Sequence, residues 1–351
     1  MYILGLMSGT SLDGLDIAYC RFYDKRHFQL LAAETYPYPS EWRERLGRLH
    51  LASAEEYART DVELGHYFGE AVKRFRKNHP GVVDLIASHG HTVFHQPEKG
   101  FTAQIGDGNA IAAECGLPVV YDFRRLDVAL GGQGAPLVPI GDRLLYGDYS
   151  CCINLGGIAN ISYEKEGERI AYDICPCNMA LNHLARMGGQ DYDRDGAFAS
   201  QGRVDTAIVE QMSNLDFYRQ MPPKTLGKEW FETEFLPILQ DSDLSLPDLM
   251  RSTSEHIATM IADAVKAIAI KSGGSVLITG GGARNTFLTN CIKEKLSPVT
   301  VTIPDGETID YKEAIIFALL GFLRVQGETN TLASVTGACR DSIGGVMCGV
   351  V

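Results

Sequence analysis

At roughly 100–200 residues per domain, a chain of 351 residues predicts two domains or one large one. Hydrophobic residues make up 45% and charged residues 22%, globular values that argue against disorder, coiled coil and collagen. The 32 basic and 44 acidic residues give a net charge of −12, which argues against a general surface for nucleic acid or anionic membrane. Glycine is in excess, with 37 residues where roughly 7% of the chain is typical, so the positions of the glycines are informative.

The composition also indicates a compartment. No apolar run reaches the roughly 20 residues of a membrane-spanning helix, and no signal peptide is visible before the first apolar run. The nine cysteines are an odd number, and several, such as Cys20, Cys151 and Cys152, lie in apolar strand-like runs rather than in a disulfide framework. These features predict a cytoplasmic protein.

The first part of the chain alternates apolar runs with helical patterns. Residues 2–7 are expected to form a strand that ends in a glycine-rich turn, and two more strands are expected at 16–23 and 28–35. The elements expected next are helices at 40–50 and 54–78, strands at 82–88 and 101–105, a helix at 107–115, a strand at 118–121 and a loop at 131–136.

The pattern of strand, glycine turn, strand, strand then recurs, with strands expected at 151–155, 158–163 and 169–172. The remaining expected elements are helices at 179–187, 198–214, 252–271, 285–295 and 311–325 and strands at 276–279 and 299–302. Strands mixed with crossover helices predict an α/β fold, and the repeat predicts two related domains that face a cleft. We place the domains at 1–130 and 131–351 and expect the last helix to pack back on the first domain.

Three glycine-rich turns each follow a predicted strand. The turn at 9–14 combines glycine with hydroxyl side chains, and its backbone N–H groups can form an anion-binding nest. The turn at 154–160 has the same architecture, and the run 280–282 precedes a helix whose N-terminus favours negative charge. Each turn alone is equally an ordinary turn, and none is a Walker A or Rossmann motif. Three of them in two repeated modules predict a phosphate-binding site.

These turns resemble those of the sugar kinase/Hsp70/actin ATPase superfamily. More narrowly, residues 6–16 resemble the N-terminal signature of the 1,6-anhydro-N-acetylmuramic acid kinase family. Further motifs of that family match, in order, at 88–92, 104–106, 122–127, 131–139, 192–197 and 335–338. The resemblance implies two related actin-like (ribonuclease H-like) domains facing an interdomain cleft, with ATP and Mg²⁺ as cofactors.

The resemblance also implies a reaction. Asp173 would activate water to attack the anomeric carbon, the 1,6-anhydro bridge would open, and the freed O6 would take the γ-phosphoryl of ATP, giving N-acetylmuramic acid 6-phosphate and ADP. Phosphoryl transfer depends mainly on positioning and charge stabilisation, which suits the glycine turns. The implied ATP-binding residues are Gly9, Thr10, Ser11, Leu12, Asp13, Gly14, Leu15, Asp16, Asn154, Gly156, Gly157, Gly280, Gly281 and Gly282. Mg²⁺ binds through few carboxylates, and Asp13, Asp16 and Asp173 are candidates without assignment as direct ligands.

Asp173 follows an apolar run at an expected strand end, where sites of α/β proteins are found. From the residues alone it is equally a cap or turn residue. In the family the base is the Asp of an aromatic-Asp-x-x-Pro-x-Asn pattern, which residues 172–178 match. This chain has Cys175-Pro176-Cys177-Asn178 where the family usually has Gly-Pro-Gly-Asn, and Asn182 where it usually has Asp. We therefore expect a loop with less backbone freedom.

The substrate-binding residues implied by the resemblance are His89, Gln104, Arg124, Arg125, Asn178 and Glu313. Arginine binds carboxylates in bidentate fashion, so Arg124 or Arg125 is expected on the lactyl carboxylate, with an ion pair to Asp122 or Asp127 as the alternative. Without the family, Glu313 reads equally as a first-turn residue that complements a helix dipole.

Two other site chemistries are less favoured. His89, His91 and His95 suggest a metal, but no partner at zinc spacing is evident and the strand is expected to end near Ser88. The run 175–177 lacks the two-residue spacer of a redox motif.

Two rival functions stay open. A kinase of the same superfamily would use Asp173 to deprotonate an ordinary sugar hydroxyl. A nucleotide-gated binding protein of the Hsp70/actin type would need a large partner-binding extension, for which the chain has no spare segment. The expected partners are a small sugar and ATP, not nucleic acid or a membrane, and a homodimer is compatible with the resemblance.

Overall fold

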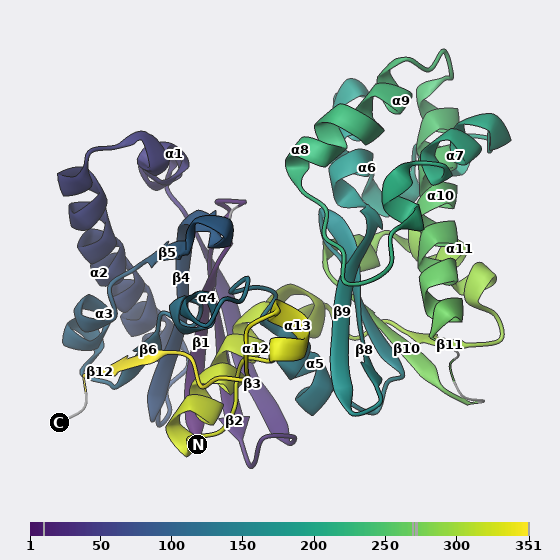
Figure 1. The fold of residues 1–351 in the computed structure, drawn as a ribbon. Coiled ribbons are helices and arrows are strands. Elements are labelled where there is room, and N and C mark those ends of the chain that lie inside the picture. Colours follow the sequence, from purple (N-terminus) through teal and green to yellow (C-terminus); the bar gives the residue numbers. More distant parts are fainter. Residues whose placement is uncertain (10, 269, 271–272, 350–351) are drawn as a thin grey trace. The chain divides into compact units, whose positions relative to one another are not determined.

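A computed structural model describes residues 1–9, 11–268, 270 and 273–349 of the chain. The chain forms two compact units (Figure 1): unit 1 comprises Met1–Leu145 and Tyr311–Val351, and unit 2 comprises Tyr146–Asp310. This division differs from the predicted boundary near residue 130. Residues 131–145 belong to the first unit because Leu137 and Ile140 share an apolar core with Phe317 and with strands of that unit. Phe317 lies in the last long helix, which packs on the first unit as expected.

Unit 1 is built on a seven-stranded mixed sheet. The strands are β1 (Tyr2–Ser8), β2 (Gly14–Phe22), β3 (Phe28–Pro37), β4 (Leu85–Gln96), β5 (Phe101–Ile105), β6 (Val119–Tyr121) and β12 (Val346–Cys348). Their order is β12-β6-β4-β1-β2-β3, and β5 pairs with β4. The strand β1 lies antiparallel to β2 and parallel to β4.

Apolar side chains on these strands alternate between two buried faces. Leu4 and Ile86 contribute to one core cluster, whereas their neighbours Ile3 and Leu85 contribute to another. Successive strand residues point to opposite faces, so a strand that is apolar throughout is covered on both sides. The helices α2 (Ala54–Asn78) and α3 (Gly108–Cys115) cover the first face, and α5 (Val138–Leu145) and α12 (Gly306–Gln326) cover the second (Figure 1). Unit 1 therefore has three layers.

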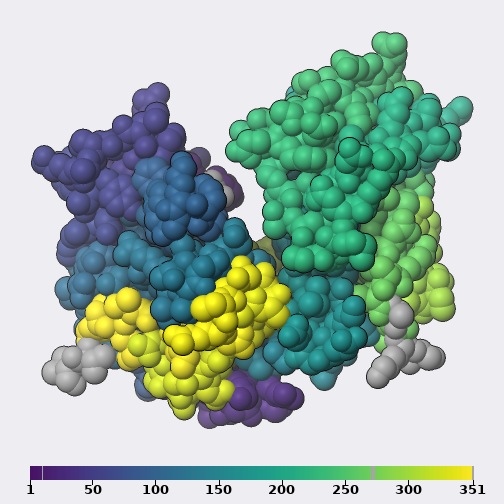
Figure 2. All heavy atoms as spheres, in the orientation of Figure 1, coloured from purple at the N-terminus to yellow at the C-terminus, as the bar shows by residue number. Residues whose placement is uncertain are grey.

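The C-terminal segment is bound to the loop that follows the short helix α4 (Arg125–Ala129). The Gln133 N–H donates to the Thr336 carbonyl at 2.8 Å, and the Cys339 N–H donates to the Leu130 carbonyl at 3.0 Å. Thr336 is the last residue of α13 (Ala333–Thr336). In Figure 2 the yellow C-terminal atoms lie directly against the blue ones of this region.

Unit 2 repeats this plan. Its strands are β7 (Cys151–Leu155), β8 (Ile158–Lys165), β9 (Glu168–Pro176), β10 (Ser275–Thr279) and β11 (Thr300–Thr302), in the order β11-β10-β7-β8-β9. The first three strands are antiparallel, and β10 and β11 add parallel strands, as β4 and β6 do beside β1. The helices α6 (Asn178–Met187), α10 (Leu246–Ala267) and α11 (Thr286–Leu296) share a core with this sheet. The repeat confirms the predicted fold of two related α/β units with ribonuclease H-like strand order.

Four predicted elements are wrong in extent. The strand β4 continues past Ser88 to Gln96 because residues 91–96 pair with β5. The strand β9 continues past Tyr172 to Pro176 because residues up to Pro176 pair with β8. The helix predicted at 198–214 is broken, and α7 (Thr206–Ser213) begins only after Asp205, whose carboxylate accepts the Ile208 N–H. The helix predicted at 252–271 ends at Ala267, and residues 269, 271 and 272 lie outside the described chain.

Further helices went unpredicted. Besides α4, α5 and α13, they include α8 (Lys228–Trp230) and α9 (Leu236–Gln240), which are joined by a π-helical turn at Phe231–Phe235.

We predict that Gly5→Ala destabilises unit 1. A Cβ at Gly5 would overlap the Ala314 carbonyl oxygen and lie 2.9 Å from the Ala318 nitrogen, so α12 could not keep its place on β1. Overpacking of this kind costs typically about 1–3 kcal/mol, and occasionally more. The urea unfolding midpoint measures the effect.

The control is Gly47→Ala in α1 (Ser40–Arg48), where a Cβ would lie 3.5 Å from Leu12 Cδ1, an ordinary contact. Alanine is the better helix former, so this variant should unfold at the same or a higher urea concentration. Equal midpoints for the wild type and Gly5→Ala would contradict the packing of α12 on β1.

Candidate functional site

Two of the predicted phosphate-binding turns meet in unit 2. Because β10 is parallel to β7 with Thr279 opposite Asn154, the loop after β10 begins beside the turn between β7 and β8. Gly280 has a φ of +84°, and a Cβ there would lie 2.5 Å from the Asn154 Oδ1 atom. A side chain is excluded by both the conformation and the space, so only glycine fits. The structure brings together the predicted residues Asn154, Gly156, Gly157, Gly280, Gly281 and Gly282.

Asn178 joins these two turns. Its Nδ2 donates to the Leu155 carbonyl at 2.9 Å, and its backbone N–H donates to the Gly156 carbonyl at 3.1 Å. A Cβ on Gly282 would lie 2.9 Å from the Asn178 Oδ1 atom. Asn178 was predicted to bind substrate, and in the structure its contacts shape the glycine turns at the start of α6.

Asp173 lies within β9, opposite Asn160, and not at a strand end as predicted. Its N–H donates to the Lys224 carbonyl at 3.0 Å, and its Oδ2 accepts the Leu226 N–H at 2.8 Å. Burial raises the pKa of this partly buried carboxyl, and the bond from Leu226 opposes the increase. The arrangement suits a general base, since one carboxylate oxygen is oriented and the group binds a proton more readily than an ordinary Asp.

The segment that orients Asp173 was missed from the sequence. It follows the 3₁₀ turn Asp216–Arg219, where the Tyr218 hydroxyl contacts the buried His256 Nε2 at 2.9 Å. The Lys224 Nζ donates to the Phe217 carbonyl at 3.2 Å and lies over the Phe217 ring. The contacts to Asp173 come from backbone atoms, which any residue carries, so no residue pattern could have indicated them.

The remaining phosphate-binding candidates lie around the turn between β1 and β2. Leu12 has a positive φ of 60°, and a Cβ on Gly14 would lie 2.9 Å from Pro37 Cα, so β3 runs close behind this turn. Ser11 and Asp13 are exposed, whereas Leu15 is a fully buried core residue. Gly9 is the turn's first residue, and the predicted residue Thr10 lies outside the described chain.

The carboxylates suggested for Mg²⁺ fall in different units, with Asp13 and Asp16 in unit 1 and Asp173 in unit 2. Asp16 Oδ1 accepts the Thr35 hydroxyl at 2.6 Å. Among the described residues, no group of three or more His, Cys, Asp or Glu side chains is arranged to hold a metal. His91 contacts the Ser8 hydroxyl at 3.1 Å, and His95 contacts that of Thr102 at 3.0 Å, so both are in hydrogen bonds.

A second polar cluster lies in unit 1 around Arg124. Its Nε donates to His89 Nε2 at 3.0 Å, and its Nη1 donates to the Gly134 carbonyl at 2.7 Å. Burial lowers the Arg124 pKa to about 10, while Glu313 and Asp127 act in the opposite direction. Desolvation raises the Glu313 pKa, and the positive charge of Arg124 opposes that increase. The cluster therefore consists of the Arg124 guanidinium with the Glu313 carboxyl near it.

The other two predicted substrate-binding residues in unit 1, Gln104 and Arg125, differ in burial and in their hydrogen-bond partners. Gln104 lies on β5 beside Gly90, its Nε2 donates to the Thr102 hydroxyl at 2.8 Å, and within the described chain its buried Oε1 accepts no hydrogen bond. Arg125 is exposed and forms an ion pair with Asp122 at 3.5 Å. The structure therefore separates the two arginines, and Arg125 has the carboxylate partner anticipated as its alternative.

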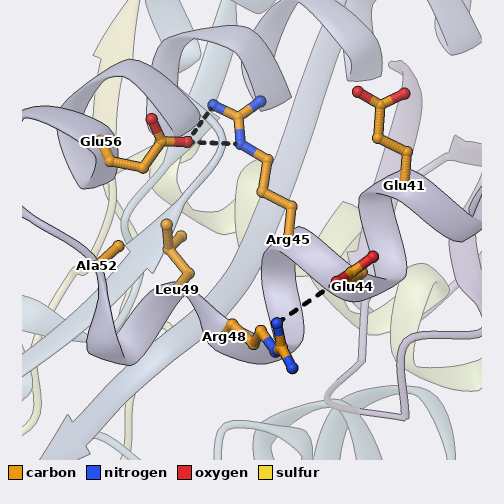
Figure 3. Close-up of a pocket in the computed structure, with 7 residues that line it drawn as sticks. All are labelled: Glu41, Glu44, Arg45, Arg48, Leu49, Ala52 and Glu56. Carbon is orange, nitrogen blue, oxygen red and sulfur yellow. Dashed lines mark hydrogen bonds and ion pairs between the residues drawn. The ribbon is translucent and has the colours of Figure 1, made fainter.

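A surface cavity of about 360 Å³ lies elsewhere in unit 1, lined by α1, the start of α2 and the turn between them (Figure 3). Its arginines are already paired, since Arg45 contacts Glu56 at 3.0 Å and Arg48 contacts Glu44 at 3.5 Å. None of the predicted site residues lines it, so it is not the candidate site.

Comparison with known proteins identifies the family. A protein-family model for anhydro-N-acetylmuramic acid kinase matches residues 1–349. The anhydro-N-acetylmuramic acid kinase of Picosynechococcus sp. is 36% identical over 378 residues, covering 99% of this chain and 100% of that one. That of Vibrio cholerae is 37% identical over 363 residues, covering 96% and 95%. The structure of (R)-2-hydroxyglutaryl-CoA dehydratase component A from Acidaminococcus fermentans aligns over 93% of this chain and 99% of that one, at 12% identity and a TM-score of 0.49.

The two sequence relatives and the family match place the chain among enzymes that transfer a phosphoryl group to an alcohol acceptor. Within that class, it belongs to the anhydro-N-acetylmuramic acid kinase family. Among the residues that the structure describes, none of the helices combines the length and the hydropathy that a transmembrane segment requires.

We predict that Asp173→Asn stabilises the protein at neutral pH. Since the folded-state pKa of Asp173 is above its ordinary value, ionisation at neutral pH opposes folding. That penalty decreases as the pH falls through the folded-state pKa and is absent below the unfolded-state value. An asparagine carbonyl can keep the bond from Leu226 without a charge. The difference in unfolding free energy, measured by urea titration at several pH values, should therefore favour the variant at pH 7 and vanish in acid. A variant less stable than the wild type at pH 7 would contradict the burial of this charge.

Proposed function

We propose that the protein is an ATP-dependent kinase that opens the anhydro ring of 1,6-anhydro-N-acetylmuramic acid with water and phosphorylates O6. The observation that supports this most directly is the setting of Asp173, a partly buried carboxyl with a raised pKa and one oxygen held by the Leu226 N–H. Cys177 directly follows the strand that carries Asp173, and its N–H donates to the Gly157 carbonyl at 2.8 Å. The proposed base, Asp173, is therefore close in the sequence to a residue that is hydrogen-bonded to the glycine turn between β7 and β8.

ATP is proposed to bind through the three glycine turns. Backbone N–H groups in such turns can face phosphate oxygens, and the absence of side chains lets the nucleotide approach. The joined turns of unit 2 support this role because Gly280 and Gly282 have no room for a Cβ. Asn178 is proposed to hold these turns in place.

The first glycine turn offers two carboxylates for Mg²⁺ and not a complete set of protein ligands. Asp13 is exposed there and Asp16 lies at the start of β2, but the described residues offer no cluster of three ligating side chains. Mg²⁺ normally keeps several waters and uses one or two carboxylates plus substrate phosphates, which such a pair can satisfy. When bound, the ion would neutralise charge on the phosphates of ATP.

The sugar is proposed to bind Arg124, Glu313 and Gln104. Arg124 would hold the lactyl carboxylate, whereas Arg125 is engaged with Asp122. Glu313 would accept a sugar hydroxyl, and the buried Gln104 Oε1, which lacks a partner in the described chain, would accept another donor.

The proposed chemistry at Asp173 is a single proton transfer. The carboxylate takes a proton from water as the water oxygen bonds to the anomeric carbon. The bond between that carbon and O6 breaks, and O6 bonds to the γ-phosphorus as the bond from that phosphorus to the bridging oxygen of ADP breaks. Asp173 then releases its proton to solvent. Water, ATP and the anhydrosugar thereby give ADP, one proton and the sugar 6-phosphate, in which the 1,6-anhydro bridge is opened.

Two measurements separate this reaction from phosphorylation of an ordinary sugar hydroxyl. Reaction in ¹⁸O-labelled water should place one ¹⁸O on the anomeric carbon of the product, detected by mass spectrometry after correction for exchange of the open sugar. Turnover of N-acetylmuramic acid but not of its anhydro form would favour the rival reaction. Nucleotide binding without turnover of either sugar would favour a non-catalytic binding protein.

We predict that Asp173→Asn reduces turnover by at least about a hundredfold while ATP binding is retained, because general-base catalysis typically contributes 10²–10⁴-fold. Asp216→Asn, an exposed carboxylate in the neighbouring segment, is the matched control. In the wild type the acid limb of the pH–rate profile should lie above the ordinary Asp pKa, since burial raises that of Asp173. Full activity of Asp173→Asn would remove it as the base.

A further inference from the structure

We propose that His89 is a positioning residue that fixes the guanidinium of Arg124 for an anionic substrate group and does not itself bind the sugar. This proposal rests on the proposed function, in which Arg124 holds a carboxylate. The preceding expectation was different, since the family motif implied that His89 is a direct substrate ligand.

The contacts of His89 leave no ring nitrogen for a ligand. The side chain is buried, with 4% of its surface exposed, and its ring lies 4.6 Å from that of Phe317. The Nδ1 is 2.8 Å from the Gly90 carbonyl, which can only accept, so Nδ1 carries the proton. Arginine can only donate, so the Nε2 that receives the Arg124 Nε–H is the unprotonated nitrogen. A neutral imidazole with one fixed tautomer satisfies both bonds.

The charge state is consistent with this assignment. Burial and the positive charge of Arg124 both lower the pKa of His89 far below its ordinary value. A protonated ring would place a second cation against the guanidinium and remove the acceptor on which Arg124 depends.

The second anchor of Arg124 is the Gly134 carbonyl, which Thr336 of the C-terminal segment supports through Asp127. The Arg124 Nη1 donates to the Gly134 carbonyl, and the Gly134 N–H donates to Asp127 Oδ2, each at 2.7 Å. The Thr336 hydroxyl donates to the other oxygen of Asp127, also at 2.7 Å. Asp127 is buried, with 1% exposed, so both of its oxygens are held within the fold. Thr336 therefore reaches Arg124 through two intermediates.

These two anchors define what Arg124 can still do. They use its Nε–H and one Nη1 bond, and a guanidinium has five N–H donors in a fixed planar fork. The remaining donors sit on the two Nη atoms, in the geometry that pairs with both oxygens of a carboxylate. Holding the fork before binding reduces the ordering cost of the complex. A residue that fixes the fork should therefore improve the recognition of a carboxylate specifically.

The test compares two sugars that differ only at the lactyl group. One is the anhydrosugar with its carboxylate, and the other is its carboxamide. The ratio of kcat/KM for acid over amide does not depend on the fraction of folded enzyme, so a partly unfolded variant is still informative. We expect His89→Leu to lower this ratio by roughly tenfold, the scale of one charge-assisted hydrogen bond, without changing the KM for ATP. His89→Gln can present a carbonyl acceptor to Arg124 and should recover part of the ratio.

A double-mutant cycle identifies the route of the effect. Arg124→Met should lower the ratio most, and adding His89→Leu to it should lower the ratio no further, because His89 acts through Arg124. Thr336→Val should lower the ratio less than His89→Leu does. His79→Leu is the matched control: it removes a partly buried histidine of unit 1 that contacts Glu34 and should leave the ratio unchanged.

Three results would overturn the proposal: an unchanged ratio in His89→Leu, effects of His89→Leu and Arg124→Met that multiply, or a loss of the ratio in Arg125→Met but not in Arg124→Met. If the wild type turns over neither sugar, the proposed function fails. The same acid-over-amide ratio is then taken from dissociation constants measured by calorimetry, so the role of His89 is judged separately. Binding of neither sugar would overturn both.

Discussion

The pairing of the first strand of each unit is the constraint on which the candidate site depends. In unit 2, β7 lies between the antiparallel β8 and the parallel β10. A hairpin turn must follow β7 on the side of β8, and the parallel β10 must end at the same edge. The register sets Thr279 beside Asn154, so the glycine loop after β10 starts next to the turn. The contact between two segments far apart in the sequence is therefore a consequence of strand order.

The same constraint acts in unit 1 with a different chemical result. The strand β4 is parallel to β1, with His91 opposite Ser8, so His89 and Gly90 occupy the edge that the loop after β10 occupies in unit 2. There the strand does not end in a glycine run. It continues as a partner of β5, and the edge carries His89 with its bond to Arg124. The repeat thus keeps a glycine turn in both units. The edge beside it carries a glycine loop in unit 2, whereas in unit 1 it carries the neutral His89, which is hydrogen-bonded to the charged Arg124.

The sequence predicted what depends on local pattern and repetition. The strand–turn–strand units and the helix at 54–78 are periodic apolar patterns, and the structure has that helix with the same ends. The ends of β4 and β9 were predicted too early, because their continuation is set by pairing with neighbouring strands and not by their own apolar residues. The domain division differs for a related reason, since residues 131–145 share an apolar core with α12, which follows them far along the chain. The packing of α12 on β1, more than 300 residues earlier in the chain, was itself expected.

Within the candidate site, residue types were visible but their contacts were not. Arg124 and Arg125 are adjacent and chemically alike, and only the fold shows that one meets His89 while the other meets Asp122. The orientation of Asp173 depends on the backbone of Leu226, which carries no residue-specific signal.

The energetics of the site explain why these groups need such extensive support. Burial raises the pKa of Asp173 and lowers that of Arg124, and each shift means that the charged form is less stable in the fold than in water. By contrast, the buried pair of Lys312 and Asp142, at 2.7 Å and 6% exposure each, places opposite charges in direct contact. Asp173 and Arg124 are instead held by neutral partners, the Leu226 N–H, the His89 ring and the Gly134 carbonyl. A neutral partner orients a charge without neutralising it, which leaves the carboxylate able to take a proton and the guanidinium able to bind an anion.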